Sequence, residues 1–156
     1  MILPLLLLLA SAPSSAAAEK CEGPPVLMVV TGPTHDGPRM RAYGEAIAKS
    51  GLYQQLGGYY LNAPRPVAIF EGEPPKNLTT LIVRFPCLAN AKTFWNSKVY
   101  QEAIKPLRLN PSAGDYLVAV YPEAPLRPDM KGKVIAPDYR QRFQSGGIEQ
   151  VEPTRK

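Results

Sequence analysis

The sequence has few of the residues that bind metals: it contains one histidine and two cysteines. A structural zinc site takes four ligands, which are cysteine, histidine or carboxylate groups in tetrahedral geometry. Cys21, Cys87 and His35 cannot complete such a site without carboxylates, and no ligand spacing is present around them. We therefore expect no metal site, and we assign no cofactor to this chain.

The sequence also lacks a stretch in which lysine and arginine alternate with aromatic residues. Its formal net charge is +5. Residues 19–121 carry 11 basic and 8 acidic side chains, and residues 122–156 carry 7 and 5. Nucleic-acid binding normally needs basic side chains gathered on one face, so this scattered excess argues against it. We expect a mildly basic, solvated surface and no nucleic-acid partner.

Long apolar runs are absent except at the N-terminus. Residues 2–10 are almost wholly apolar, and small residues follow up to Ala18. This pattern predicts a secretory signal at residues 1–18, cleaved before Glu19. The run is shorter than the roughly 20 residues of a membrane-spanning helix, although an uncleaved anchor is an alternative. We therefore predict an exported protein, periplasmic or secreted, with no integral membrane segment after cleavage.

Apolar periodicity predicts one domain at residues 19–121, with strands and helices in alternation. Strands are expected at residues 24–31, 59–72, 78–86 and 115–122, and helices at 36–58 and 88–107. Asp36 is a suitable N-cap for the first helix, and Pro38 suits its first turn. The prolines at 64 and 66 weaken the second strand, because they cannot donate to a strand ladder. Ser97 interrupts the second helix and is expected to cap its second part.

The residues after 121 differ in composition. Residues 122–156 are rich in proline and charge and show no sustained apolar period. Such a segment buries too little apolar surface to offset its ordering entropy. We predict a flexible, Pro-rich, charged C-terminal tail, with a short helical turn around residues 139–144.

The element order predicts an α+β fold. A β-α-β-β-α-β series forms a four-stranded antiparallel sheet with both helices on one face. The other face keeps apolar residues that need burial. A second copy of the chain is the simplest cover, so we expect a homodimer with two-fold symmetry.

Several stretches of the chain resemble one family. The motifs "GGYYL", "LIVRFPCLANAKTFWNSKVYQEAIKPLRL" and "YLVAVY" are similar to the domain-of-unknown-function 1330 family, over about residues 26–121. The resemblance is carried most specifically by Trp95, Ser97, Tyr100 and Arg108. It implies a ferredoxin-like subunit of the dimeric α+β barrel superfamily, and it implies no activity.

The chain departs from the pattern of that family at three positions. Cys87 stands where the family usually has serine, Arg84 lies near a position that is often acidic, and Leu56 replaces a frequent histidine. The signal segment and the tail lie outside the resemblance.

Five residues are candidates for a ligand pocket between helices and sheet: Arg84, Trp95, Tyr100, Arg108 and Tyr60. Trp95 also suits a purely structural role, because a large aromatic side chain on an apolar helix face packs well on a sheet. Tyr100 and Arg108 lie on one side of the second helix. They suit either an anionic ligand or hydrogen bonds and ion pairs within the fold.

Arg84 lies in the middle of an apolar strand, where an unpaired charge is costly to bury. The sequence leaves three interpretations open: exposure to solvent, pairing with Glu71 or Asp115, or contact with a ligand. A nucleophilic Ser97 would need a nearby base, and nothing places the lone His35 beside it, so a helix cap is favoured. His35 itself is expected in an exposed loop.

The two cysteines raise the question of a disulfide bond. With the first and third strands taken as parallel neighbours, Cys21 and Cys87 lie at opposite ends of the sheet. A strand of about six residues spans roughly 20 Å, and bonded cysteines need Cα atoms within about 7 Å. We therefore predict no bridge within one subunit, or else a bridge between chains.

Three functions remain open on this sequence. The first is a homodimer that binds a small molecule in its pocket. The second is a cofactor-independent, monooxygenase-like enzyme acting on an aromatic or lipophilic substrate, with an arginine stabilising developing negative charge. The third is a structural or interaction module whose basic tail contacts a partner or the membrane surface.

Overall fold

The computed structural model describes residues 21–130 and 148–151. The predicted signal segment, its cleavage site and the predicted helical turn at residues 139–144 lie outside these residues. Within the part that is described, no helix is both long and apolar enough to cross a membrane.

Four strands form one sheet, and most helical segments cover it. The strands are β1 (Val26–Pro33), β2 (Tyr59–Tyr60), β3 (Leu78–Phe85) and β4 (Leu117–Pro122). The helical segments are α1 (Gly37–Ser50), α2 (Leu52–Leu56), α3 (Leu88–Asn96), the π-helix η1 (Val99–Ile104), and the 3-10 helices η2 (Lys105–Arg108) and η3 (Pro128–Met130).

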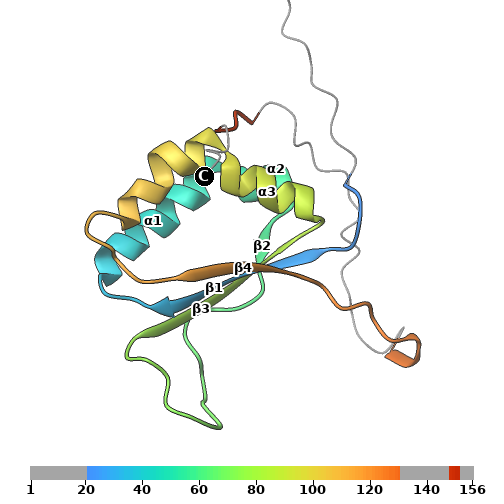
Figure 1. Ribbon diagram of the computed structural model, residues 1–156, viewed down its shortest axis with the longest axis horizontal. Coiled ribbons are helices and arrows are strands. Elements are labelled where there is room, and N and C mark those ends of the chain that lie inside the picture. The colour runs from blue at the N-terminus through green and yellow to red at the C-terminus, as the bar shows by residue number, and fades with distance from the viewer. Residues whose placement is uncertain (1–20, 131–147, 152–156) are drawn as a thin grey trace, which may run out of the picture.

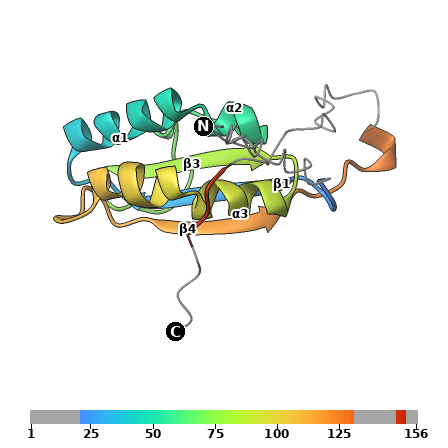
Figure 2. The same cartoon turned by 90° about the horizontal axis from the view of Figure 1, so that it is seen from above.

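The sheet has the order β2-β3-β1-β4, and all its neighbouring strands are antiparallel. The helical segments from α1 to η2 lie on one face, and no helix or strand of the described residues covers the other face (Figures 1 and 2). This arrangement confirms the predicted α+β fold with a four-stranded antiparallel sheet.

The core lies between the sheet and the helices. Met28 of β1 stands opposite Val83 of β3 and Val120 of β4, and Val26 stands opposite Phe85. Because side chains alternate along a strand, these residues share the face that the helices cover. Met28, Val83 and Phe85 are almost fully buried there.

The first predicted helix is divided into two. Asp36 caps α1 as expected, since its carboxylate accepts a hydrogen bond from the backbone N–H of Arg39 at 3.0 Å. Gly51 ends α1 with a φ of 67°, a conformation that glycine adopts at little cost, and α2 begins at the next residue. The glycine therefore breaks the helix that apolar periodicity had joined.

The second predicted helix breaks at Ser97, as expected. The Ser97 hydroxyl donates to the carbonyl of Phe94 at 2.9 Å and accepts from the N–H of Tyr100 at 3.2 Å. It thereby joins the end of α3 to the start of η1, which confirms a capping role for this serine.

The second strand is much shorter than predicted. Only Tyr59 and Tyr60 pair with β3 as a regular strand. Leu61 still donates its N–H to the carbonyl of Ile82 at 2.8 Å, and the residues that follow form a loop that extends beyond the open face of the sheet (Figure 1). Val67 and Phe70 in this loop are almost fully exposed. The prolines at positions 64 and 66 remove two backbone donors from this segment.

The disulfide prediction was wrong. Cys21 and Cys87 are bonded within one chain, with their Cα atoms 5.7 Å apart. The error lay in the strand direction: β1 and β3 are antiparallel, with Val26 opposite Phe85. The residues before β1 and after β3 therefore lie at the same end of the sheet, and the two cysteines meet without a fold-back.

Residues 148–151 return to the break between α3 and η1. The N–H of Lys98 donates to the carbonyl of Glu149 at 2.6 Å, and the N–H of Val151 donates to the carbonyl of Asn96 at 2.9 Å. Ile148 packs against the core cluster. The sequence did not predict this contact.

Candidate functional site

A cavity of about 440 Å³ lies between the helices and the sheet. Its volume falls in the range of small-molecule sites in proteins, which is roughly 300–1,000 Å³. Its walls come from all four strands or their flanks, from α1 and α2, and from α3, η1 and η2. The lining residues include Met28, Val30, Thr34, Met40, Arg41, Tyr43, Gly44, Ile47, Tyr53, Tyr60, Asn62, Arg65, Thr79, Leu81, Phe94, Trp95, Tyr100, Arg108, Tyr116 and Val118.

Most of the cavity wall is apolar. The sheet supplies aliphatic side chains such as Met28, Val30 and Val118. The helical side supplies aromatic rings, and the rings of Phe94 and Trp95 lie 4.8 and 5.2 Å from that of Tyr100, between centroids. Replacing water with an apolar molecule against such a wall is favourable, because it removes apolar surface from water.

Arg108 and two tyrosines form a polar group in this wall. The hydroxyls of Tyr43 and Tyr100 are 3.0 Å apart, and the Arg108 guanidinium lies 5.6 Å from the centre of the Tyr43 ring. Burial lowers the pKa of Arg108, but hydrogen bonds and charge interactions with Tyr100 and Tyr43 outweigh it and raise the pKa. The guanidinium therefore stays protonated at any physiological pH.

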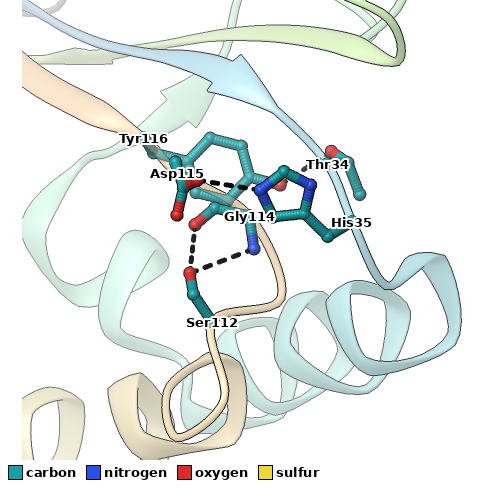
Figure 3. Close-up of polar contacts among 6 residues, drawn as sticks. All are labelled: Thr34, His35, Ser112, Gly114, Asp115 and Tyr116. Atoms are coloured by element: carbon teal, nitrogen blue, oxygen red, sulfur yellow. Dashed lines mark hydrogen bonds and ion pairs between the residues drawn. The ribbon is translucent and has the colours of Figure 1, made fainter.

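A second polar group begins at Thr34. Its hydroxyl is 2.6 Å from that of Thr79 and 2.7 Å from that of Tyr116. Figure 3 shows the Tyr116 ring directed toward Thr34. Because Arg108 also lies 6.0 Å from the centre of the Tyr116 ring, this ring links the two polar groups.

His35 and Asp115 form a pair that does not line the cavity (Figure 3). The imidazole Nε2 lies 2.9 Å from the Asp115 carboxylate, and both side chains are exposed. The hydrogen bond from His35, followed by one from Ser112, lowers the pKa of the Asp115 carboxyl. The backbone N–H of His35 also donates to Ala113, so the pair joins the start of α1 to the loop before β4.

The charged side chains among the described lining residues are arginines alone: Arg41, Arg65 and Arg108. Burial, as the largest cause, raises the pKa of Tyr43, Tyr53 and Tyr60, so these three phenols hold their protons. The wall is therefore positively charged at neutral pH and offers hydroxyl and guanidinium donors.

Four of the five predicted site residues line the cavity: Tyr60, Trp95, Tyr100 and Arg108. Trp95 also packs against the core, so its structural and pocket roles coexist. Among the described residues, no group of three or more histidine, cysteine, aspartate or glutamate side chains is arranged to hold a metal ion.

Arg84 is the predicted site residue that the structure does not bring to the cavity. It stands opposite Leu27 in the register, on the face of the sheet away from the helices. Its Nε donates to the Glu123 carboxylate at 2.6 Å. The predicted pairing of Arg84 with Glu71 or Asp115 was wrong. Its carboxylate partner is Glu123, which follows β4 and reaches Arg84 across the end of β1.

Sequence reasoning missed several residues of the site, notably Thr34, Tyr43 and Tyr116. Tyr43 lies on α1, on the side of the helix that lines the cavity. Tyr116 precedes β4, two residues before Val118 on the same face. Tyrosines at core-facing positions were a usable signal, since a buried phenol hydroxyl usually has a hydrogen-bond partner.

The chain was compared with known proteins and families. A search of curated proteins gave no match. The family described as "Domain of unknown function (DUF1330)" matches residues 25–120. This range contains the whole sheet except the last two residues of β4, together with the residues that line the cavity. The chain therefore belongs to the DUF1330 family, as its motifs indicated.

Proposed function

We propose that this protein binds a small, largely apolar molecule in the cavity between its helices and its sheet. The cavity itself carries the proposal: it is about 440 Å³ in volume and is lined by aliphatic and aromatic side chains with a few convergent polar groups. This combination is typical of sites for small organic ligands.

Binding is favoured over the enzymatic alternative by the chemistry of the wall. A general base needs a pKa near the working pH. Burial raises the pKa of Tyr43, Tyr53 and Tyr60, and the described lining residues include no carboxylate, histidine, lysine or cysteine. These groups can hold and orient a ligand, but they do not readily accept a proton from it.

The experiment fills the cavity from Gly44. This residue lines the cavity from α1, and a Cβ added to it meets no atom within 4 Å. Gly44→Leu should therefore fill the space without a clash and also favour the helix. The probe is N-phenyl-1-naphthylamine, a neutral fluorophore that accepts energy from tryptophan. Trp95 is the only tryptophan of the chain and lines the cavity, so energy transfer reports binding there.

The matched control is Ala42→Leu, an exposed position on the same helix. We expect wild type and Ala42→Leu to bind the probe equally, and Gly44→Leu to lose binding at an unchanged or higher melting temperature. Probe binding that survives in Gly44→Leu would place the probe elsewhere and contradict the proposal, and so would a wild type that binds no probe.

The proposal includes a homodimer formed through the open face of the sheet. The residues on this face alternate with those of the core, and several are apolar: Leu27, Val29, Ile82, Leu117, Ala119 and Tyr121. Leu117 and Tyr121 are more than half exposed in the single chain. A self-complementary apolar face of this kind is typical of two-fold dimers.

The proposal also places the protein in an oxidising compartment outside the cytoplasm. The disulfide between Cys21 and Cys87 supports this location, because such bonds persist mainly in exported proteins. The predicted signal segment at residues 1–18 supports it independently.

A further inference from the structure

We propose that the ligand is a monoanion and that Arg108 binds its negatively charged group, a carboxylate or a similar oxyanion. This inference rests on the proposed function, since it names the chemical class of the molecule in the same cavity. It commits to one orientation, with the anionic group at Arg108 and the apolar body against the rings of Phe94 and Trp95.

The first support is the burial of an uncompensated charge. Arg108 is 9% exposed, and none of the four ion pairs among the described residues includes it. Its neighbours in the wall are the phenols of Tyr43, Tyr100 and Tyr116, and the described residues that line the cavity include no aspartate or glutamate. A buried cation without a counter-charge is costly, and an anionic ligand would relieve that cost.

The second support is the geometry around the guanidinium. The ring centres of Tyr43 and Tyr116 lie 5.6 and 6.0 Å from Arg108 Cζ, so two aromatic rings flank the group. A guanidinium has five N–H donors, so the hydrogen bonds of Arg108 with Tyr43 and Tyr100 leave donors for a planar oxyanion, which an arginine fork binds with two hydrogen bonds. The hydroxyls of Tyr43 and Tyr100 are 3.0 Å apart, so they act together as a second donor beside it.

The third support is the charge of the cavity rim. Arg41 on α1 and Arg65 in the loop after β2 are exposed lining residues, and no acidic residue balances them among the described lining residues. A rim of one sign attracts ligands of the opposite sign and raises their association rate. Among the described residues, the cavity thus has positive charge both at its entrance and in its wall.

The test uses two probes that differ by one charged group. 8-Anilinonaphthalene-1-sulfonate is an anion, and N-phenyl-1-naphthylamine has the same aromatic body without the sulfonate. Both accept energy from Trp95, so both are detected in the cavity. We expect wild type to bind the anion about tenfold more tightly or better, which is the gain expected from a charge-assisted hydrogen bond.

Arg108→Gln should remove this preference and leave binding of the neutral probe within about twofold of wild type. The control is Arg127→Gln, which removes the same charge from an exposed residue that does not line the cavity. It should keep the preference for the anion. Arg108→Lys keeps the charge but not the planar fork, so we expect it to bind the anion with intermediate affinity.

The outcomes separate this inference from the proposed function. If neither probe binds near Trp95, the proposed function fails. If the neutral probe binds and the anion binds no better, the proposed function stands and the inference is overturned. An anion preference that persists in Arg108→Gln would assign the charge recognition to another arginine. If Arg108→Gln does not fold, Arg108→Lys serves as the test. An anion affinity that is unchanged in Arg108→Lys would contradict a bidentate contact with Arg108.

Discussion

Cys87 is fully buried and is joined to Cys21 across 66 positions of sequence. In the chain-entropy account, closing a loop of this length stabilises the fold by about 4 kcal/mol, because it restricts the unfolded chain. We expect the double variant Cys21→Ala/Cys87→Ala to lose roughly 2–5 kcal/mol of unfolding free energy in urea titrations.

The control for this prediction is a reductant. Dithiothreitol should lower the urea midpoint of the wild type and leave that of the double variant unchanged. A wild type whose midpoint does not respond to reductant would show that the bond contributes no stability, or that it is not formed in solution.

The buried tyrosines predict a loss of stability in alkali. Burial, followed by the nearby phenols, raises the pKa of Tyr43 and Tyr53 above the usual value, which is about 10 in an unfolded chain. The folded state therefore binds protons more tightly than the unfolded state. Its stability should be complete below about pH 10 and fall as the pH rises further.

Ultraviolet absorbance of the phenolate form and circular dichroism test this together. We expect part of the phenolate signal to appear only when the protein unfolds. Tyr53→Phe should reduce the steepness of the loss of stability above pH 10. Ionisation of all eight tyrosines in a protein that remains folded would contradict the prediction.

At the scale of elements, residues 148–151 stabilise the break between α3 and η1. They supply backbone partners at Asn96 and Lys98, where the helical hydrogen-bond pattern is interrupted, and Ile148 adds apolar contact. We expect a chain that ends at Gly147 to lose about 1–2 kcal/mol of stability. In hydrogen exchange, the amide of Lys98 should lose protection before the amides of β1 do.

The side-chain pair between Lys98 and Glu149 is the control for this element. Both side chains are substantially exposed, at 43% and 68%, so screening by solvent leaves the pair little energy. Lys98→Gln should change stability by less than about 1 kcal/mol. If Lys98→Gln matched the truncation, the side-chain pair and not the backbone contact would hold the segment.

At the scale of the whole molecule, the uncovered face of the sheet predicts dimerisation. Ile82 lies near the centre of this face, opposite Val29. A charge at a buried dimer interface is costly to desolvate. We therefore expect wild type to sediment as a dimer and Ile82→Lys to sediment as a folded monomer in analytical ultracentrifugation.

Ala48→Lys introduces the same charge at an exposed position of α1, on the opposite side of the sheet, and should remain dimeric. Ile82→Lys that still forms dimers would exclude this face as the interface. A monomeric wild type would remove the dimer from the proposal but not the cavity, whose walls come from one chain.

The sequence by itself determined much of this protein, because the signals concerned are local. A short apolar run rich in β-branched residues predicted β1, and alternating apolar residues predicted β3. The Asp36 and Ser97 caps were predicted from the residue types that satisfy free backbone groups. The motif around Trp95 indicated the family, and with it the α+β sheet. Trp95, Tyr100 and Arg108 share one wall because they lie on successive turns of neighbouring helical segments.

The tertiary structure decided what depends on strand direction and on pairing across the chain. The antiparallel register of β1 and β3 brought Cys21 to Cys87, and the position of β4 brought Glu123 to Arg84. Pairing across the sheet also brought Thr34 to Thr79 and Tyr116, and the Tyr116 ring lies 6.0 Å from Arg108. Residues 148–151 pair with Asn96 and Lys98 at the break between α3 and η1, and the apolar periodicity of the sequence does not predict this pairing. These contacts join residues that are far apart in sequence. The local preference of a residue for helix, strand or turn does not determine which distant residues come into contact.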